Sequence, residues 1–266
     1  MMKKIRIQIG FLYLLILIAC TPYKQRMVEN AVRFDTISIQ RTAHWNNDSS
    51  KPSCCISIEF VYPDSANVRI LNRLQNVFIS KLLDDSFVGL PPQQAMEEYA
   101  QLYIQNFHQI DTNQKDTIEG IALHEDETGY LYHQDLKTKV VFNADSLISF
   151  LVETNDYKGG SYSNPAVKAY VFNLKTNDFV QENQFAGQNY EANLSKLLTG
   201  KIAVSDDIKE DEIVPNNNFT IDDKGLTYYF NEEDGVFSAS TKSIFIPYNE
   251  LSIYITSDSP LSPFIE

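Results

Sequence analysis

The four histidines come first, because imidazole is a frequent metal ligand and general base. They are His44, His108, His124 and His133. No two of them have the close spacing along one helix or loop that a metal-dependent deacetylase needs. His124 and His133 flank a predicted turn that also carries acidic residues, so they could meet across a hairpin and hold a metal. Acidic residues in a turn are more typical of solvated surface, and we therefore expect no metal and no cofactor.

Nucleophiles and acidic clusters give no stronger indication of catalysis. The chain contains neither a Gly-x-Ser-x-Gly elbow nor a phosphate-binding loop. The acidic run at 206–212 lacks the regular alternation and central glycine of a calcium loop. Cys54 and Cys55 are adjacent at the start of a predicted strand, where their side chains should point to opposite faces. We expect two packed thiols there rather than a redox switch, and no enzymatic activity.

A third kind of chemistry, lipid attachment, is indicated at the N-terminus. Lys3, Lys4 and Arg6 precede an apolar run from Ile7 to Ala19. That run is shorter than the roughly 20 residues that a membrane-spanning helix needs, and is typical of a signal peptide. It ends in Leu-Ile-Ala-Cys20, which resembles the bacterial lipobox.

The lipobox resemblance implies that residues 1–19 are removed and that Cys20 carries acyl chains such as palmitate, which attach the protein to a membrane. Thr21 follows the cysteine in place of the aspartate that commonly retains lipoproteins at an inner membrane. We therefore expect a lipid-anchored protein of the bacterial cell envelope, located at the outer membrane and facing either the periplasm or the surface.

The charge of the chain limits its partners. It has 22 cations, 35 acids and a net charge of −13. Loss of Lys3, Lys4 and Arg6 with the signal peptide would lower the net charge by three, to −16. Such a surface repels nucleic acid and attracts basic proteins. With 43% hydrophobic and 12% aromatic residues, the chain can also bury a substantial core.

Hydrophobic periodicity predicts an α+β fold: antiparallel sheet with two helices of the N-terminal half packed on one face, and a short helix in the C-terminal half. The expected helices begin near Ala66 and Pro92, and the short one spans about 189–198. Strands are expected at 34–39, 55–62, 118–124, 130–132, 140–142, 147–153, 167–174, 219–221, 226–230 and 243–247. We divide the chain into a signal peptide (1–19), a lipidated tether (20–33), a strand–helix portion (34–115) and a C-terminal domain (116–266).

The C-terminal half also carries an ordered series of motifs. A strand at 147–153 is followed by Tyr-Lys-Gly-Gly at 157–160, and the next strand ends in Asn-Leu-Lys-Thr at 173–176. A hairpin at 219–230 and the segment Ile-Pro-Tyr-Asn-Glu-Leu at 246–251 complete the series. This order resembles the RsiV/PdaC-type extracytoplasmic domain, found in a lysozyme-sensing anti-sigma factor and beside a peptidoglycan deacetylase.

The loop after residue 156 is the candidate ligand site. Its candidate residues are Tyr157, Gly159, Gly160, Ser161, Tyr162 and Asn164. Paired glycines permit positive φ and close approach of a ligand, and exposed tyrosines are good binding anchors. The alternative is a tight turn whose aromatic rings pack back on the sheet. Members of the family commonly have Ala-His where this chain has Ser161-Tyr162, so any role of that histidine does not transfer.

Together these features predict a non-enzymatic envelope lipoprotein that binds or senses a ligand. The resemblance implies that the ligand is a cationic protein such as lysozyme, or peptidoglycan or another glycan. Two alternatives stay open: an enzyme that modifies envelope glycans, since any two of the 35 acids might pair, and a structural subunit of an outer-membrane assembly.

Overall fold

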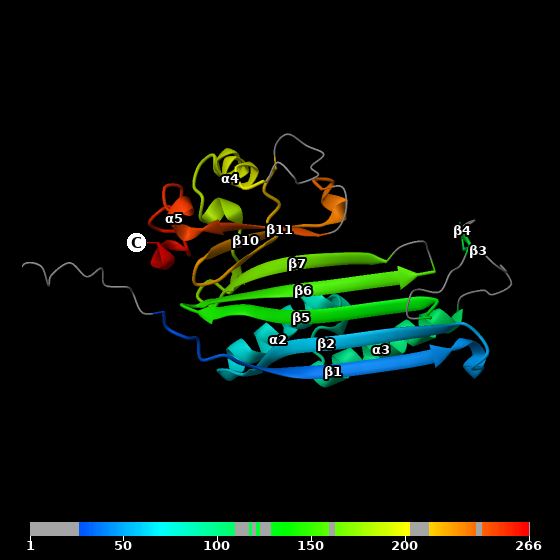
Figure 1. The fold of residues 1–266 in the computed structure, drawn as a ribbon. Helices are drawn as coiled ribbons and strands as arrows, with labels where there is room; N and C mark the ends of the chain where they lie inside the picture. The colour runs from blue at the N-terminus through cyan, green and yellow to red at the C-terminus, as the bar shows by residue number, and fades with distance from the viewer. Residues whose placement is uncertain are drawn as a thin grey trace, which may run out of the picture.

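A computed structural model describes residues 27–109, 117–118, 121–122, 129–159, 163–202, 213–237 and 241–265. Several residues singled out by the sequence lie outside these ranges: Cys20 and the signal peptide, His124, the acidic run at 206–212, and Gly160, Ser161 and Tyr162. The described part confirms the α+β fold, with one large sheet, a smaller sheet and helices on both sides (Figure 1).

The large sheet has six strands in the order β1-β2-β5-β6-β7-β8. They are β1 (Arg33–His44), β2 (Ser53–Ser65), β5 (Tyr132–Ala144), β6 (Leu147–Lys158), β7 (Asn164–Asn173) and β8 (Asp178–Phe179). All neighbours are antiparallel except β2 and β5, which are parallel. A parallel pair needs a long crossover, and the two main helices lie within this one. The predicted portions 34–115 and 116–266 therefore share one sheet.

Helices α2 (Val68–Leu82) and α3 (Pro92–Gln109) lie along one face of the large sheet. The side chain of Asn67 caps α2 by accepting a hydrogen bond of 3.2 Å from the Arg69 amide, and Pro92 opens α3, where a missing N–H costs nothing. Phe78 of α2 stacks on Phe150 of β6 with ring centroids 4.1 Å apart. Each of these two rings is fully buried, so this face carries one of the two main cores.

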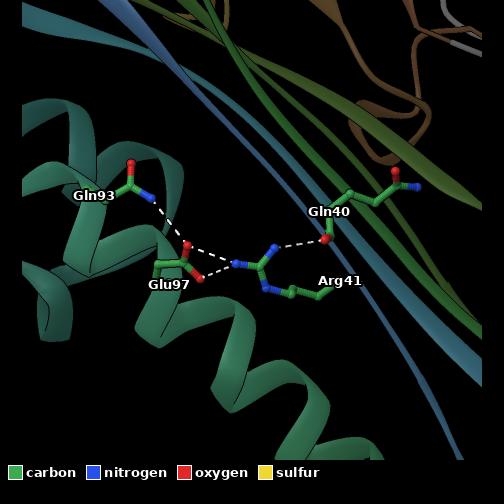
Figure 2. Close-up of polar contacts among 4 residues, drawn as sticks. All are labelled: Gln40, Arg41, Gln93 and Glu97. Atoms are coloured by element: carbon green, nitrogen blue, oxygen red, sulfur yellow. Dashed lines mark hydrogen bonds and ion pairs between the residues drawn. The ribbon is translucent and has the colours of Figure 1, made fainter.

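An ion pair joins α3 to the edge strand β1 (Figure 2). One guanidinium nitrogen of Arg41 donates to both carboxylate oxygens of Glu97, at 2.9 and 2.7 Å. Gln93, one turn earlier on α3, also donates to Glu97, at 3.2 Å. Both charged side chains are more than one-third exposed, so the pair orients the helix more than it stabilises the fold.

The opposite face of the large sheet is covered in part by the three-stranded sheet β11-β10-β9. Its strands are β9 (Phe219–Ile221), β10 (Gly225–Phe230) and β11 (Lys242–Pro247), accompanied by α4 (Tyr190–Thr199) and α5 (Tyr248–Leu251). Their buried side chains meet Leu147 and Val171 of the large sheet in the second main core. β6 is thus buried on both faces, which explains its nearly continuous apolar start.

Asparagine side chains fasten the small sheet to β7. Asn218 accepts a hydrogen bond from the Ala169 amide at 2.6 Å and donates to the carbonyl oxygens of Val167 and Tyr229 at 2.9 and 3.0 Å. Asn231 accepts from the Val167 amide at 2.8 Å and donates to the Val167 carbonyl at 3.0 Å. The two side chains satisfy β7 backbone groups that the short edge strand β8 does not reach.

The remaining elements are short. The strands β3 (Thr117–Ile118) and β4 (Ile121–Ala122) pair with each other. Short 3₁₀ helices lie at Trp45–Asn47, Asp85–Phe87, Glu182–Gln184, Glu232–Asp234 and Ser262–Phe264.

One sequence prediction for the sheet is wrong. Separate strands at 130–132 and 140–142 are a single long strand, β5, with a bulge between Val140 and Phe142. The residues between them are mostly polar although few of them are exposed; Thr138, for example, is fully buried. A run of polar residues gives no apolar pattern from which the strand could be predicted. β5 turns into β6 through Asp145 and Ser146, which have φ of 50° and 69°, as in a tight hairpin turn.

Candidate functional site

A pocket of about 310 Å³ lies between α3 and the ends of β5 and β6. Its volume is at the small end of the range for ligand pockets, which starts at roughly 300 Å³. We call it the tyrosine pocket. Its lining residues are Tyr99, Leu102, Tyr103, Asn106, Phe107, Tyr132, Gln134 and Lys158. Aromatic rings supply most of the wall, and amide and amino groups are the polar minority, as is typical of small-molecule sites.

The α3 side of the tyrosine pocket follows from helical spacing. Its residues recur at 99, 102, 103, 106 and 107, which places them on one face of a helix. Phe107 is held at the base of this wall by edge-to-face contact with the buried Trp45, with ring centroids 5.4 Å apart. Leu102 is 42% exposed and Asn106 is exposed, so these two residues form the rim.

The sheet side of the pocket contributes Tyr132 and Gln134 from β5 and Lys158 from β6. The Tyr132 ring contacts Phe107 at 5.6 Å between centroids. Gln134 accepts a hydrogen bond of 3.0 Å from the Tyr99 hydroxyl, which ties the two walls together. In the β5–β6 register, Lys158 lies opposite Tyr132 and Asp156 opposite Gln134.

Asp156 lies opposite the pocket residue Gln134 in the β5–β6 register, and only one of its two carboxylate oxygens has a partner among the described residues. Its Oδ2 accepts an ion pair from Nζ of Lys158 at 2.7 Å. Among the described residues, its buried Oδ1 has no hydrogen-bond partner, and the same is true of the buried Tyr103 hydroxyl. Burial raises the pKa of Tyr103 well above its ordinary value, and the negative charge of Asp156 adds to the effect. Burial and Asp156 raise the pKa of Tyr132 in the same way.

The candidate residues predicted from the sequence differ in where the structure places them. Tyr157 is only 6% exposed and lies on the sheet face opposite Lys158, so it packs on the sheet rather than serving as an exposed anchor. Gly159 has φ of 70°, as the glycine pair predicts. Asn164 is exposed, and its register partner is Asp156, so it lies at the pocket end of the sheet. The remaining candidates lie outside the described residues.

Lys158 is the residue of this segment that sequence reasoning missed. It is the x of Tyr-x-Gly-Gly, a position that carries no motif information. Only the strand register shows that it, and not Tyr157, lines the pocket. The α3 tyrosines were predicted as the apolar face of a core helix. Helical spacing alone does not show that the part of this face at residues 99, 102, 103, 106 and 107 is left uncovered by the sheet.

A thiol, an imidazole and a carboxylate lie together on the other face of the sheet. Cys55 is the register partner of His133, whose Nε2 lies 3.3 Å from Asp135 Oδ1. Cys55 is 1% exposed, however, and its sulfur accepts hydrogen bonds from Gln40 at 3.7 Å and from Thr42 at 3.8 Å. The geometry is that of a packed thiol without access for a substrate.

Cys54 points to the helix side, as the sequence predicts for adjacent strand residues. It packs with Trp45 and Phe107, and burial raises the pKa of its thiol to about 11. Both thiols are free and buried, as expected for two packed cysteines.

Among the described residues there is no group of three or more His, Cys, Asp or Glu side chains that could hold a metal ion. None of the helices in that part of the chain is long and apolar enough to cross a membrane.

Solved structures share this architecture. A member of the DUF3298 family from Bacteroides fragilis superimposes with a TM-score of 0.77 and 22% identity, covering 89% of this chain and 98% of its own. The chain has the fold of DUF3298 proteins. A DUF3298 family protein from Pseudomonas aeruginosa PAO1 matches with a TM-score of 0.55 and 10% identity, over 86% of this chain and 97% of its own. No protein-family model and no curated protein matches the sequence.

The match to the first of these structures covers 89% of this chain, so it extends over both the strand–helix portion and the C-terminal domain predicted from the sequence. The narrower RsiV/PdaC-type resemblance stays a sequence-based prediction, as do lipidation of Cys20 and location in the envelope. Neither structural relative brings a stated activity, so function must be argued from the site of this chain.

Proposed function

We propose that this DUF3298-fold protein is a non-enzymatic binding module of the bacterial cell envelope and that its ligand enters the tyrosine pocket. The observation that carries the proposal is the pocket itself: an aromatic-walled space of about 310 Å³ whose wall includes Tyr103, with a buried hydroxyl that has no hydrogen-bond partner among the described residues. Such a hydroxyl is costly unless a ligand or water satisfies it, so it favours a binding site over a packing gap.

The absence of turnover is also part of the proposal. The titratable groups at the pocket are tyrosines, one lysine and the neighbouring Asp156. Burial raises the pKa values of the tyrosine hydroxyls, and Asp156 is held in an ion pair with Lys158, so the proposal gives these groups a role in binding rather than in proton transfer. An envelope location rests on the lipobox at Cys20 and on the signal peptide before it.

A capture experiment tests the proposal. The full chain, purified in detergent and immobilised, is exposed to envelope extract, and the retained molecules are identified. Asn106→Trp places a large ring at the rim of the pocket, while Asn183→Trp adds the same ring at an exposed asparagine beside a different hollow, lined by Asn183, Gln184, Gly187, Gln188, Thr256 and Asp258. We expect a ligand that wild type and Asn183→Trp retain, that Asn106→Trp loses, and that is released chemically unchanged. Equal retention by all three chains, or a converted product, contradicts the proposal.

The charge of the chain favours a second candidate, a basic protein such as lysozyme. A net charge of −13, or −16 without the signal peptide, attracts a cationic partner and raises its association rate. That binding should weaken steeply with salt and should be unaffected by Asn106→Trp, because a protein partner meets the surface and not the pocket. Titration calorimetry that shows no heat with lysozyme at low salt removes this candidate.

A further inference from the structure

We propose that the tyrosine pocket binds one uncharged sugar ring of a saccharide. This inference rests on the proposed function, because it assumes that the pocket is a ligand site, and it names the class of ligand.

The lining matches the two kinds of surface that a sugar ring presents. A pyranose has faces of C–H groups, which pack on aromatic rings, and a rim of hydroxyl groups, which both donate and accept hydrogen bonds. The pocket offers the rings of Tyr99, Tyr103, Tyr132 and Phe107. Between them stand the amides of Asn106 and Gln134, each of which carries donors and an acceptor.

The unpaired Tyr103 hydroxyl points to a hydroxyl group in the ligand. Tyr103 lines the pocket, and its buried hydroxyl has no hydrogen-bond partner in the described part of the chain, although it can donate one hydrogen bond and accept others. A saccharide hydroxyl that reaches it would remove a desolvation cost rather than exchange one bond for another.

The ion pair beside the pocket favours an uncharged ligand. Asp156 and Lys158 already neutralise each other across 2.7 Å. A cationic guest would compete with Lys158 for Asp156, and an anionic guest would compete with Asp156 for Lys158. Burying an unbalanced charge there carries a large penalty, which a neutral ring avoids.

Tyr103 provides a signature that separates binding from packing. Its hydroxyl is buried and unpaired in the free protein, so Tyr103→Phe should leave the thermal stability unchanged or raise it. The same substitution should weaken saccharide binding by about tenfold, the effect of one hydrogen bond. A residue that acts only in packing would not show these opposite responses.

The test uses the full chain in detergent and titration calorimetry with chitotriose, maltotriose and spermidine. We expect heat with at least one of the two saccharides, a loss of about tenfold in affinity in Tyr103→Phe, no binding to Asn106→Trp, and wild-type binding to Asn183→Trp. Spermidine should bind without dependence on Asn106.

Three results overturn the inference: no binding of either saccharide, saccharide binding that Asn106→Trp leaves intact, or spermidine binding that Asn106→Trp abolishes. If the saccharides fail but the extract still yields a ligand that Asn106→Trp loses, only the sugar assignment is wrong. If the extract yields no such ligand, the proposed function fails with it.

Discussion

The Tyr99 hydroxyl on α3 donates a hydrogen bond of 3.0 Å to Oε1 of Gln134 on β5. This bond joins the helical wall of the tyrosine pocket to its sheet wall, at a place where both side chains are only partly buried. It therefore sets the width of the pocket as well as the position of α3 on the sheet.

Removing this bond should cost a small, measurable amount of stability. Tyr99→Phe keeps the ring and its edge-to-face contact with Phe87 but loses the hydrogen bond, so the free energy of unfolding should fall by about 1 kcal/mol. Tyr190→Phe is the matched control, because the Tyr190 hydroxyl donates to Glu191, its neighbour in the sequence, at an exposed site. Urea denaturation of both variants checks this, and an equal effect of the two would contradict the role of the bond.

Asn218 should contribute far more to the stability of the fold than is usual for an asparagine, a residue type that is mostly found at the surface. Asn218→Ala leaves the Ala169 amide and the carbonyl oxygens of Val167 and Tyr229 without this partner, so we expect a loss of about 2–4 kcal/mol. Asn183→Ala, at an exposed position, should change stability by less than about 0.5 kcal/mol. Thermal unfolding followed by circular dichroism compares them, and similar melting temperatures would show that the small sheet does not depend on Asn218.

The buried Glu182 should make the stability depend on pH. Burial raises its pKa above the ordinary value of 4.5, although its Oε1 accepts a hydrogen bond of 2.8 Å from the Asn217 amide. A raised pKa favours folding while the carboxyl is protonated, so this contribution is complete below pH 4.5 and is lost as the pH rises through the folded-state pKa. Glu182→Gln should therefore gain stability over wild type at pH 7 and little at pH 4.

Denaturation curves of wild type and Glu182→Gln at the two pH values measure that difference directly. Glutamine keeps the acceptor for Asn217, so the comparison isolates the charge. A difference between the two proteins that is the same at pH 4 and pH 7 would mean that the carboxyl does not titrate with folding.

Lipidation should depend on one atom, the sulfur of Cys20. Cells that express the wild-type chain and are fed labelled palmitate should incorporate the label, whereas Cys20→Ser should incorporate none and should remain unprocessed. Cys54→Ser is the control for thiols, because this buried cysteine of the folded part is not a lipid acceptor. Label retained in Cys20→Ser would rule out the lipobox assignment.

The sequence was informative where structure is local. The three- and four-residue spacing of apolar side chains located α2 and α3, and Asp222 to Gly225 located the β9–β10 hairpin, because each is determined by neighbours in the chain. Adjacent Cys54 and Cys55 were correctly assigned to opposite faces for the same reason.

What the sequence could not provide depends on contacts between distant segments. The parallel pairing of β2 with β5 follows from a crossover of both helices, and nothing in either strand encodes that partner. The pocket arises because α3 covers the ends of β5 and β6 incompletely, so Tyr103 reads as a core residue in the sequence. Tyr157 was assigned to a turn-rich loop, either as a binding anchor or as a ring packed back on the sheet, yet it belongs to β6, which the register extends to Lys158.

The central claim is that the ligand binds in the tyrosine pocket, and amide hydrogen exchange of the full chain measures this without any substitution. With saturating ligand, either the molecule captured from envelope extract or the saccharide that binds in calorimetry, we predict slower exchange in α3 from Tyr99 onward and at the β5 and β6 ends around Tyr132 and Lys158, with no change in β9, β10 or β11. Slower exchange confined to the small sheet, or unchanged exchange throughout the chain, would contradict the account.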